Sequence, residues 1–261
     1  MKSVYTGGEK VAEFESYDEL RVGENKPAFI YEGNEIVYPN PVKDGLVLWY
    51  DFSGRTNADG QRGIAEDLSG NGNHGTLQNF NFTAESGYVG NKLKFDGIDD
   101  EVIVGTFSDS RFHQPAMTVE WTGIIREEQP LSGINHIFSG GYVAGWALGF
   151  HGQYNGLMAT VKDSNGASGY RISYPIHNPI RDIPYNLVMV FQQGSKKEYL
   201  NGVLVSEDNN FGFPDYTSTP QVRIAKSAYQ STLSCKTYNR PLTPEEIAHN
   251  YAIEKERFGI E

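Results

Sequence analysis

Apolar and polar residues alternate along many short stretches between residues 45 and 238, which predicts β-strands with one buried face. In residues 46–52 every second side chain is leucine or aromatic, so we expect one face of this strand in a core. Residues 117–125 alternate in the same way, with Thr118, Glu120 and Thr122 on a face that we expect to be exposed. Residues 186–191 are apolar on both faces, which indicates a central strand. Further strands are predicted at residues 146–150, 197–200, 203–205, 221–225 and 233–238.

Short residue patterns predict one hairpin turn and one helix. Asn201 and Gly202 separate two short apolar runs, a pattern typical of a two-residue type I′ hairpin turn. Thr243, Pro244 and Glu246 supply an N-cap, a proline at the first helical position and a capping-box glutamate. A helix is therefore predicted from there to the end of the chain, with Ile247, Tyr251 and Phe258 on its apolar side. Strands at this spacing with one closing helix predict an all-β, two-sheet antiparallel sandwich or jelly roll.

The first 41 residues differ from the rest. Residues 29–32 and 35–38 are β-prone and flank Gly33-Asn34, which predicts a type II′ hairpin. Residues 11–20 mix acidic and aromatic side chains without a clear period, and Pro39 and Pro41 mark a linker. An isolated hairpin is marginally stable in water, so this arm is expected to pack on a partner. We therefore predict an attachment arm and linker over residues 1–41 and a sandwich domain over residues 42–261.

Composition and charge narrow the possible partners. The formal net charge of −11 argues against nucleic-acid binding and against an anionic membrane surface, since both need a basic face. The single cysteine, Cys235, excludes an internal disulfide and is expected to point inward from its strand. No apolar run approaches the roughly 20 residues of a membrane span, so membrane insertion is not expected. The start of the chain lacks the apolar core of a signal peptide, which predicts synthesis and folding in a cytoplasm.

A glycine-rich stretch at residues 67–77 predicts a tightly folded loop instead of a regular strand or helix. Gly70, Gly72 and Gly75 adopt positive φ without steric cost, and Asp67, Asn71 and Asn73 can hydrogen-bond nearby backbone. A related fragment follows at residues 93–100 and leads into the β-prone residues 101–104.

These two fragments, with residues 45–52, 199–205 and 236–247, resemble laminin-G-like, or concanavalin A-like, jelly-roll domains. The closing residues 250–260 are similar to the form found in bacteriophage virion proteins, and the N-terminal hairpin resembles attachment segments of baseplate and tail-fibre proteins. The resemblance implies a virion protein of the baseplate, tail fibre or capsid surface, made in the host bacterial cytoplasm. Its arm would dock to other virion proteins, and its sandwich would bind a host cell-surface glycan. A homo-oligomer is compatible with this role, although no heptad or repeat fixes the number of copies.

The same resemblance implies a structural Ca²⁺ ion on a loop at the rim of the sandwich. Asp67, Asn71, Asn73 and Asp96 could supply its oxygen ligands. The alternative is that these residues only tie the turn to the following strand, since Asn and Asp in such turns need no metal. Residues 99–101 (Asp99, Asp100 and Glu101) form a second acidic cluster, for which a solvated strand entry is the alternative.

Aromatic side chains near turns are candidates for stacking against sugar rings. Tyr142, Tyr154 and Tyr170 lie beside Gly-rich turns, and Tyr216 closes a long polar loop. Tyr174 is a further candidate, and His151 and His177 are candidate hydrogen-bonding neighbours. Trp146 alternates with Leu148 and Phe150 and is expected in the core.

Catalysis is not supported by any motif. Glycosidases need paired carboxylates, with about 5–5.5 Å between them in retaining enzymes. Glu120 and Glu198 each stand alone on a predicted strand. The six histidines show no metal-type spacing. We therefore expect a binding protein without catalytic residues. The alternatives are a ligand-free structural or decoration protein and a polysaccharide-degrading enzyme.

Overall fold

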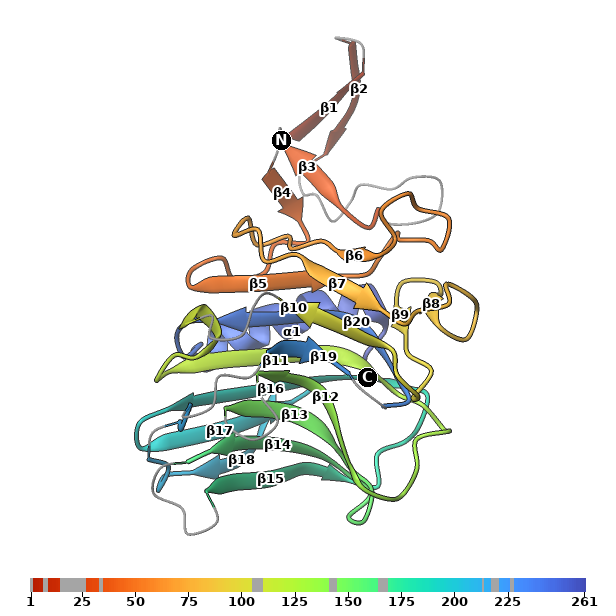
Figure 1. Ribbon diagram of the computed structural model, residues 1–261. Helices are drawn as coiled ribbons and strands as arrows, with labels where there is room; N and C mark the ends of the chain where they lie inside the picture. The colour runs from red at the N-terminus through yellow and green to blue at the C-terminus, as the bar shows by residue number, and fades with distance from the viewer. Residues whose placement is uncertain are drawn as a thin grey trace. The chain divides into compact units, whose positions relative to one another are not determined.

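The computed structural model describes residues 2–6, 9–14, 27–32, 35–104, 110–140, 145–163, 169–212, 214–216, 221–225 and 228–261, with backbone alone for 2–14 and 32 (Figure 1). The chain divides into two compact units, Met1–Pro41 and Val42–Glu261. Each unit is described by itself.

The first unit contains two antiparallel strand pairs. Strand β1 (Lys2–Thr6) pairs with β2 (Glu9–Phe14), and β3 (Ile30–Glu32) pairs with β4 (Glu35–Tyr38). The β3–β4 pair confirms the two strands predicted there, while the predicted turn Gly33-Asn34 lies outside the described residues. The β1–β2 pair was not predicted.

The second unit is built on two antiparallel sheets (Figure 1). The first sheet has the order β15-β14-β13-β12-β19-β10-β7-β6, and the second has the order β18-β17-β16-β11-β20-β9-β8, with β5 also pairing with β20. The first sheet consists of β6 (Ile64–Ala65), β7 (Gly75–Gln78), β10 (Glu101–Val104), β12 (Ile134–Gly140), β13 (Trp146–His151), β14 (Gly156–Lys162), β15 (Tyr170–His177) and β19 (Val222–Ile224). The second consists of β5 (Leu46–Asp51), β8 (Gly87–Tyr88), β9 (Leu93–Lys94), β11 (Met117–Ile125), β16 (Pro184–Gln192), β17 (Ser195–Leu200), β18 (Val203–Asp208) and β20 (Gln230–Tyr238). The predicted fold class, an all-β antiparallel sandwich with a C-terminal helix, is confirmed.

The core lies between the two sheets, because each contributes one apolar face. Trp146 and Phe150 come from the first sheet, and Trp121 and Leu187 come from the second. Trp146 is fully buried, as predicted, and Cys235 is a buried free thiol.

Helix α1 (Pro244–Phe258) begins with the predicted capping box between Thr243 and Glu246 and ends at Gly259, which has φ 65°. Its buried residues are Ile247, Asn250 and Glu254, so the predicted apolar side, with Tyr251 and Phe258, is wrong in part. Asn250 and Glu254 are buried because they hydrogen-bond to polar residues of the second sheet. No helix within the described part of the chain is long and apolar enough to cross a membrane.

The outer face of β11 is buried, contrary to the prediction, because its Glu120 also hydrogen-bonds to α1. Thr118, Glu120 and Thr122, expected to be exposed, are buried. Glu120 accepts a hydrogen bond from Asn250 of α1, which covers this part of the second sheet. The hairpin between β17 and β18 follows the prediction, with φ 48° at Asn201 and 76° at Gly202.

Candidate functional site

The outer face of β12–β15, which points away from the core, carries the candidate site. Leu157, Ala159 and Val161 of β14 belong to the core. Because side chains alternate along a strand, Met158 and Thr160 point to the outer face. Strands β12 to β15 lie side by side at one end of the first sheet (Figure 1).

Four rings from this end of the sheet form an aromatic cluster: His151, Tyr154, Tyr174 and His177. The ring centroids of Tyr154 and Tyr174 lie 4.9 Å apart, and those of His151 and Tyr154 lie 4.7 Å apart. The ring centroid of Tyr174 also lies 5.8 Å from that of His151 and 5.7 Å from that of His177. Tyr154 is 51% exposed, so the cluster offers an aromatic ring to solvent.

A small hollow of about 190 Å³ lies on the same face. Its wall includes Gly145 and Trp146 in addition to side chains from three strands. Gly149 has no room for a side chain, since a Cβ atom there would lie 2.7 Å from the Asn135 carbonyl oxygen and 3.0 Å from Met158 Cε. The side chains that line the hollow are Ile134, His136, Met158, Thr160, Tyr170 and Ile172.

The strand register makes the aromatic cluster and the hollow continuous. His151 of the cluster pairs with Ile134 of the hollow across β13 and β12. Ile172 pairs with Thr160 across β15 and β14, and Tyr174 follows two residues after Ile172 on the same strand. The two features therefore form one continuous surface.

Two buried polar atoms on this surface lack a hydrogen-bond partner among the described residues: Thr160 Oγ1 and His151 Nδ1. Buried polar atoms are nearly always paired, so orphaned ones mark places where a ligand or water could bind. Burial lowers the pKa of His136 to about 4, so this imidazole is neutral near pH 7.

The predicted sugar-contacting residues fall into three groups. Tyr154 lies in the aromatic cluster and Tyr170 lines the hollow. Tyr142 lies outside the described residues. Tyr216 packs against the core and against His113, with 4.8 Å between ring centroids, and its hydroxyl donates to the Gln114 carbonyl oxygen. Tyr216 therefore does not offer a free ring as Tyr154 does, because its ring and hydroxyl are both engaged within the fold.

The predicted calcium ligands Asp67, Asn71 and Asn73 are held by hydrogen bonds within the glycine-rich turn. The Asp67 carboxylate accepts from the backbone N–H groups of Trp49, Ser69 and Asn73 at 2.8–3.0 Å, and from the Ser69 hydroxyl. The side-chain amides of Asn71 and Asn73 donate to the Val47 carbonyl oxygen. Because both Asp67 oxygens already accept hydrogen bonds, this turn fits a calcium ion poorly.

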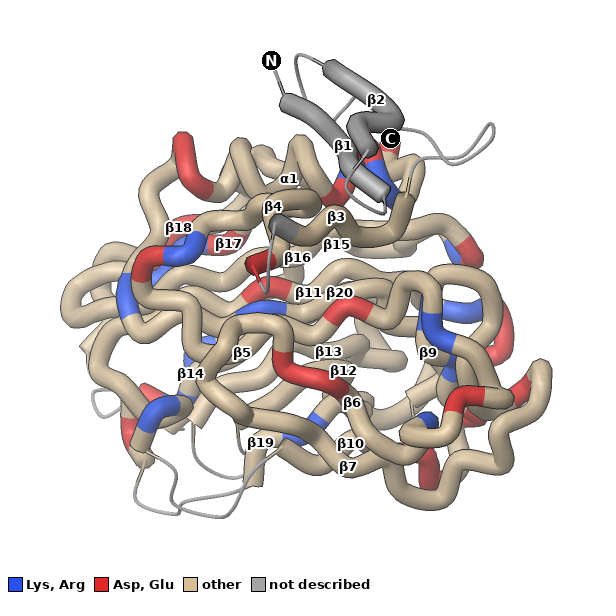
Figure 2. The backbone as a smooth tube through the Cα atoms, turned by 90° about the horizontal axis from the view of Figure 1, so that it is seen from above, with Lys and Arg blue, Asp and Glu red and all other residues tan. Residues whose placement is uncertain are grey.

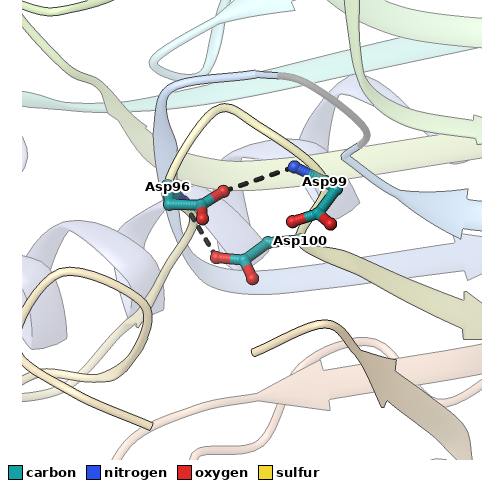
Figure 3. Close-up of side chains that lie close together, drawn as sticks. All are labelled: Asp96, Asp99 and Asp100. Carbon is teal, nitrogen blue, oxygen red and sulfur yellow. Dashed lines mark hydrogen bonds between the residues drawn. The ribbon is translucent and has the colours of Figure 1, made fainter. Parts of the chain in front are cut away.

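Asp96 belongs to a different group, with Asp99 and Asp100 (Figure 3). Oxygen atoms of the three carboxylates lie within 4.8 Å of one another. Burial, followed by the negative charges of Asp96 and Asp99, raises the pKa of Asp100 to about 6. Three carboxylates are suitable calcium ligands, so this donor set fits the ion better than the turn does. Glu101 is directed elsewhere and pairs with Arg223. A calcium ion stays a prediction for this protein.

The two glutamates considered for catalysis are closed off from solvent. Glu120 lies 3.2 Å from the Lys236 ammonium group, and Glu198 pairs with Lys196. All four side chains are at most 2% exposed. Neither ion pair was predicted. Lys236 is 116 residues from Glu120, so spacing could not identify that pair, whereas Lys196 and Glu198 are two residues apart on one face of β17 and could have been recognised.

A second cavity, of about 480 Å³, lies beside the second sheet and is lined by charges of both signs. Its Lys94 and Arg126 pair with Glu85 and Glu128, so their charges are already compensated. Figure 2 shows basic and acidic residues interspersed along the chain in the same way.

No family model and no curated relative matches the sequence. Several solved structures are similar to the chain. The Trypanosoma rangeli sialidase has a TM-score of 0.58 at 17% identity, over 83% of this chain and 34% of the sialidase. A structure of botulinum neurotoxin type C, whose cell entry is dependent on interaction with two ganglioside molecules, has a TM-score of 0.59 at 12% identity, over 81% of this chain and 51% of that one. The binding domain of Paraclostridial Mosquitocidal Protein 1 has a TM-score of 0.58 at 14% identity, over 80% of this chain and 52% of that domain's chain.

The chain thus spans between about a third and a half of the structures that it resembles. At these identities the likeness concerns the fold. It shows that the chain has a two-sheet β-sandwich fold of the concanavalin A-like type.

Proposed function

We propose that this protein binds carbohydrate on the outer face of β12–β15. The observation that carries the proposal is the aromatic cluster with the exposed Tyr154 beside an apolar hollow on one continuous surface. Tyrosine presents a large rigid face at little cost in conformational entropy, and that face can cover the apolar C–H side of a pyranose ring. The orphaned His151 Nδ1 then supplies a hydrogen-bonding position for a sugar hydroxyl.

The comparisons support this proposal at the level of the fold. Two of the similar structures are of a neurotoxin that interacts with gangliosides and of the binding domain of a mosquitocidal protein. A sialidase is also among them, so the fold alone does not separate a binding protein from an enzyme. We propose a binding protein, because the two glutamates considered for acid–base chemistry are both buried and paired with lysines.

The biological setting that we propose is a bacteriophage virion, at the baseplate, tail fibre or capsid surface. This part rests on the sequence resemblance of the closing residues and of the N-terminal hairpin to virion proteins. The arm over residues 1–41 would join other virion proteins by adding strands to a sheet edge or by pairing with copies of itself. The sandwich would bind a glycan of the host cell surface.

The binding proposal is tested by retention on immobilised bacterial cell-wall polysaccharide. We expect the whole protein to be retained without releasing new reducing ends. Tyr154→Ala should abolish most of the retention, whereas Tyr154→Phe, which keeps the ring, should preserve it. Tyr251→Ala removes a tyrosine from α1, beside the second sheet, and serves as the control. Release of reducing ends would favour the enzyme, and a folded protein without retention would favour the ligand-free structural protein.

The attachment proposal needs a separate test. A variant that starts at Val42 should keep its melting temperature within a few degrees and should keep its retention on the polysaccharide. The same variant should fail to assemble with the particle or with itself. Unfolding of the shortened chain would contradict the role of the arm as an attachment segment.

A further inference from the structure

The hollow on the outer face is smaller than a complete ligand site. Its volume of about 190 Å³ lies below the roughly 300–1,000 Å³ of typical small-molecule pockets. It can therefore receive a substituent of a ligand whose main body lies elsewhere on the surface. The aromatic cluster provides that position, because Tyr174 lies two residues, or about 6.6 Å, along β15 from Ile172 in the hollow.

The chemistry of the wall defines the substituent. Ile134, Met158 and Ile172 make the wall largely apolar, which suits a methyl group. Thr160 adds one polar atom: the residue is 8% exposed, and its buried hydroxyl has no partner among the described residues. A hydroxyl both donates and accepts, so it can pair with a carbonyl oxygen or with an amide N–H.

The same wall disfavours other substituents. A free sugar hydroxyl would leave the apolar side chains without contacts. An anionic group would find no lysine or arginine among the described residues that line the hollow. His136 lines the hollow, but burial lowers its pKa to about 4 and keeps it neutral near pH 7. The fitting group is neutral and combines a methyl group with an adjacent polar amide.

We infer that the hollow receives the acetamido group of an N-acetylated sugar whose ring stacks on the aromatic cluster. The methyl group contacts Ile134, Met158 and Ile172, and the amide pairs with Thr160 Oγ1. This inference rests on the proposed carbohydrate binding and names the class of sugar.

Saturation-transfer NMR on the whole protein tests the inference with matched probes. The probes are the methyl glycosides of N-acetylglucosamine, N-acetylgalactosamine and N-acetylmannosamine, each compared with the glucoside, galactoside or mannoside that lacks the acetamido group. We expect at least one N-acetylated probe to bind more tightly than its partner, with the strongest saturation on the acetyl methyl protons.

Variants locate the contact. Thr160→Val is nearly isosteric and removes an unpaired hydroxyl, so the fold should persist while affinity for the N-acetylated probe falls about three- to tenfold. Thr160→Ser restores the hydroxyl and should recover the affinity. Affinity for the plain sugars should not change in either variant.

The outcomes separate the two proposals. Equal binding of acetylated and plain sugars, with Tyr154→Ala weakening both, overturns the inference and leaves carbohydrate binding intact. An acetyl preference that survives unchanged in Thr160→Val also overturns it, because the acetyl group then lies elsewhere. A folded protein that binds none of the sugars, and is not retained on cell-wall polysaccharide, overturns carbohydrate binding itself.

Discussion

The ammonium group of Lys236 lies 2.6 Å from the carboxylate of Glu254 and 3.2 Å from that of Glu120, all three at most 1% exposed. One buried cation thus joins α1 to strands β20 and β11. Burial opposes the charge on Lys236, yet the two carboxylates together raise its pKa above its ordinary value. Asn250 donates to Glu120 and Ser234 donates to Glu254, so both carboxylates have further partners.

Lys236→Met should therefore destabilise the protein strongly. The substitution leaves Glu120 and Glu254 buried without the lysine that pairs with both, and breaking a buried pair in this way costs about 3–5 kcal/mol. Urea unfolding followed by circular dichroism measures the effect. Lys197→Met is the matched control, since Lys197 pairs with Glu207 at 3.2 Å but both side chains are about a third exposed. The control should lose less than about 1 kcal/mol, and equal losses would contradict the role given to the buried cluster.

Gly202→Val should destabilise the β17–β18 hairpin for two reasons. Gly202 has φ 76°, which a β-branched residue adopts only with strain, and an added Cβ atom would lie 2.6 Å from Tyr251 Cδ1. We expect a loss of about 2 kcal/mol or more. Gly194→Val, at φ 80° with open space around the Cβ position, isolates the backbone contribution and should cost less. Thermal unfolding of the two variants side by side would show the difference, and identical melting temperatures would speak against the Tyr251 contact.

Asp67→Asn tests whether the glycine-rich turn needs calcium. Asn replaces an acceptor oxygen by an amide group that faces N–H donors, so we expect a loss of about 2–3 kcal/mol. The loss should be the same in EDTA and in calcium, because it arises from hydrogen bonds. A loss seen only in calcium would make Asp67 a ligand after all.

The cluster of Asp96, Asp99 and Asp100 is the alternative place for a calcium ion, and Asp99→Asn tests it. Asp99 is exposed, so Asp99→Asn should change stability by less than about 0.5 kcal/mol in EDTA. If calcium raises the melting temperature of the parent protein and Asp99→Asn removes the rise, the ion lies at Asp96, Asp99 and Asp100.

Two groups should make stability depend on pH with opposite signs. Burial lowers the pKa of His136 from 6.5 to about 4, so the unfolded chain binds more protons in this window and stability falls as pH falls from 6.5 to 4. The pKa of Asp100 is raised from 3.8 to about 6, so the folded protein binds more protons and stability falls as pH rises through that range. Urea unfolding between pH 4 and 7 measures both effects. In His136→Asn the free energy of unfolding should fall less as the pH is lowered. In Asp100→Asn it should fall less as the pH is raised. Curves parallel to that of the parent protein would contradict the assignment.

Much of the fold could be predicted because local patterns and tertiary burial agree. Strands β5, β13 and β16 carry continuous or alternating apolar residues, and α1 carries its own capping signals. Strand β15 was not predicted, because its residues are half-buried or exposed throughout and Pro175 interrupts the pattern. The exposed face expected on β11 was wrong because no local signal shows that α1 covers it.

Single residues of the candidate site could be predicted from the sequence, but the contacts between them could not. Tyr154 was named because it lies beside a Gly-rich turn, and it is indeed exposed. Its contact with Tyr174, twenty residues away, depends on the register of β13, β14 and β15, which the residue pattern does not specify. Asp67 and Asp96 were combined because both lie in similar fragments, but hydrogen bonds hold each in a different group.

Amide chemical-shift mapping shows directly whether carbohydrate binds on the outer face of β12–β15. The labelled whole protein is titrated with oligosaccharides released from bacterial cell wall, and its assigned amide signals are followed. Binding on this face predicts saturable shifts concentrated at residues 134–136, 149–160 and 170–177. Shifts concentrated at residues 67–77, or around the charged cavity of Lys92, Lys94 and Arg126, would contradict it, as would a folded protein whose signals do not move.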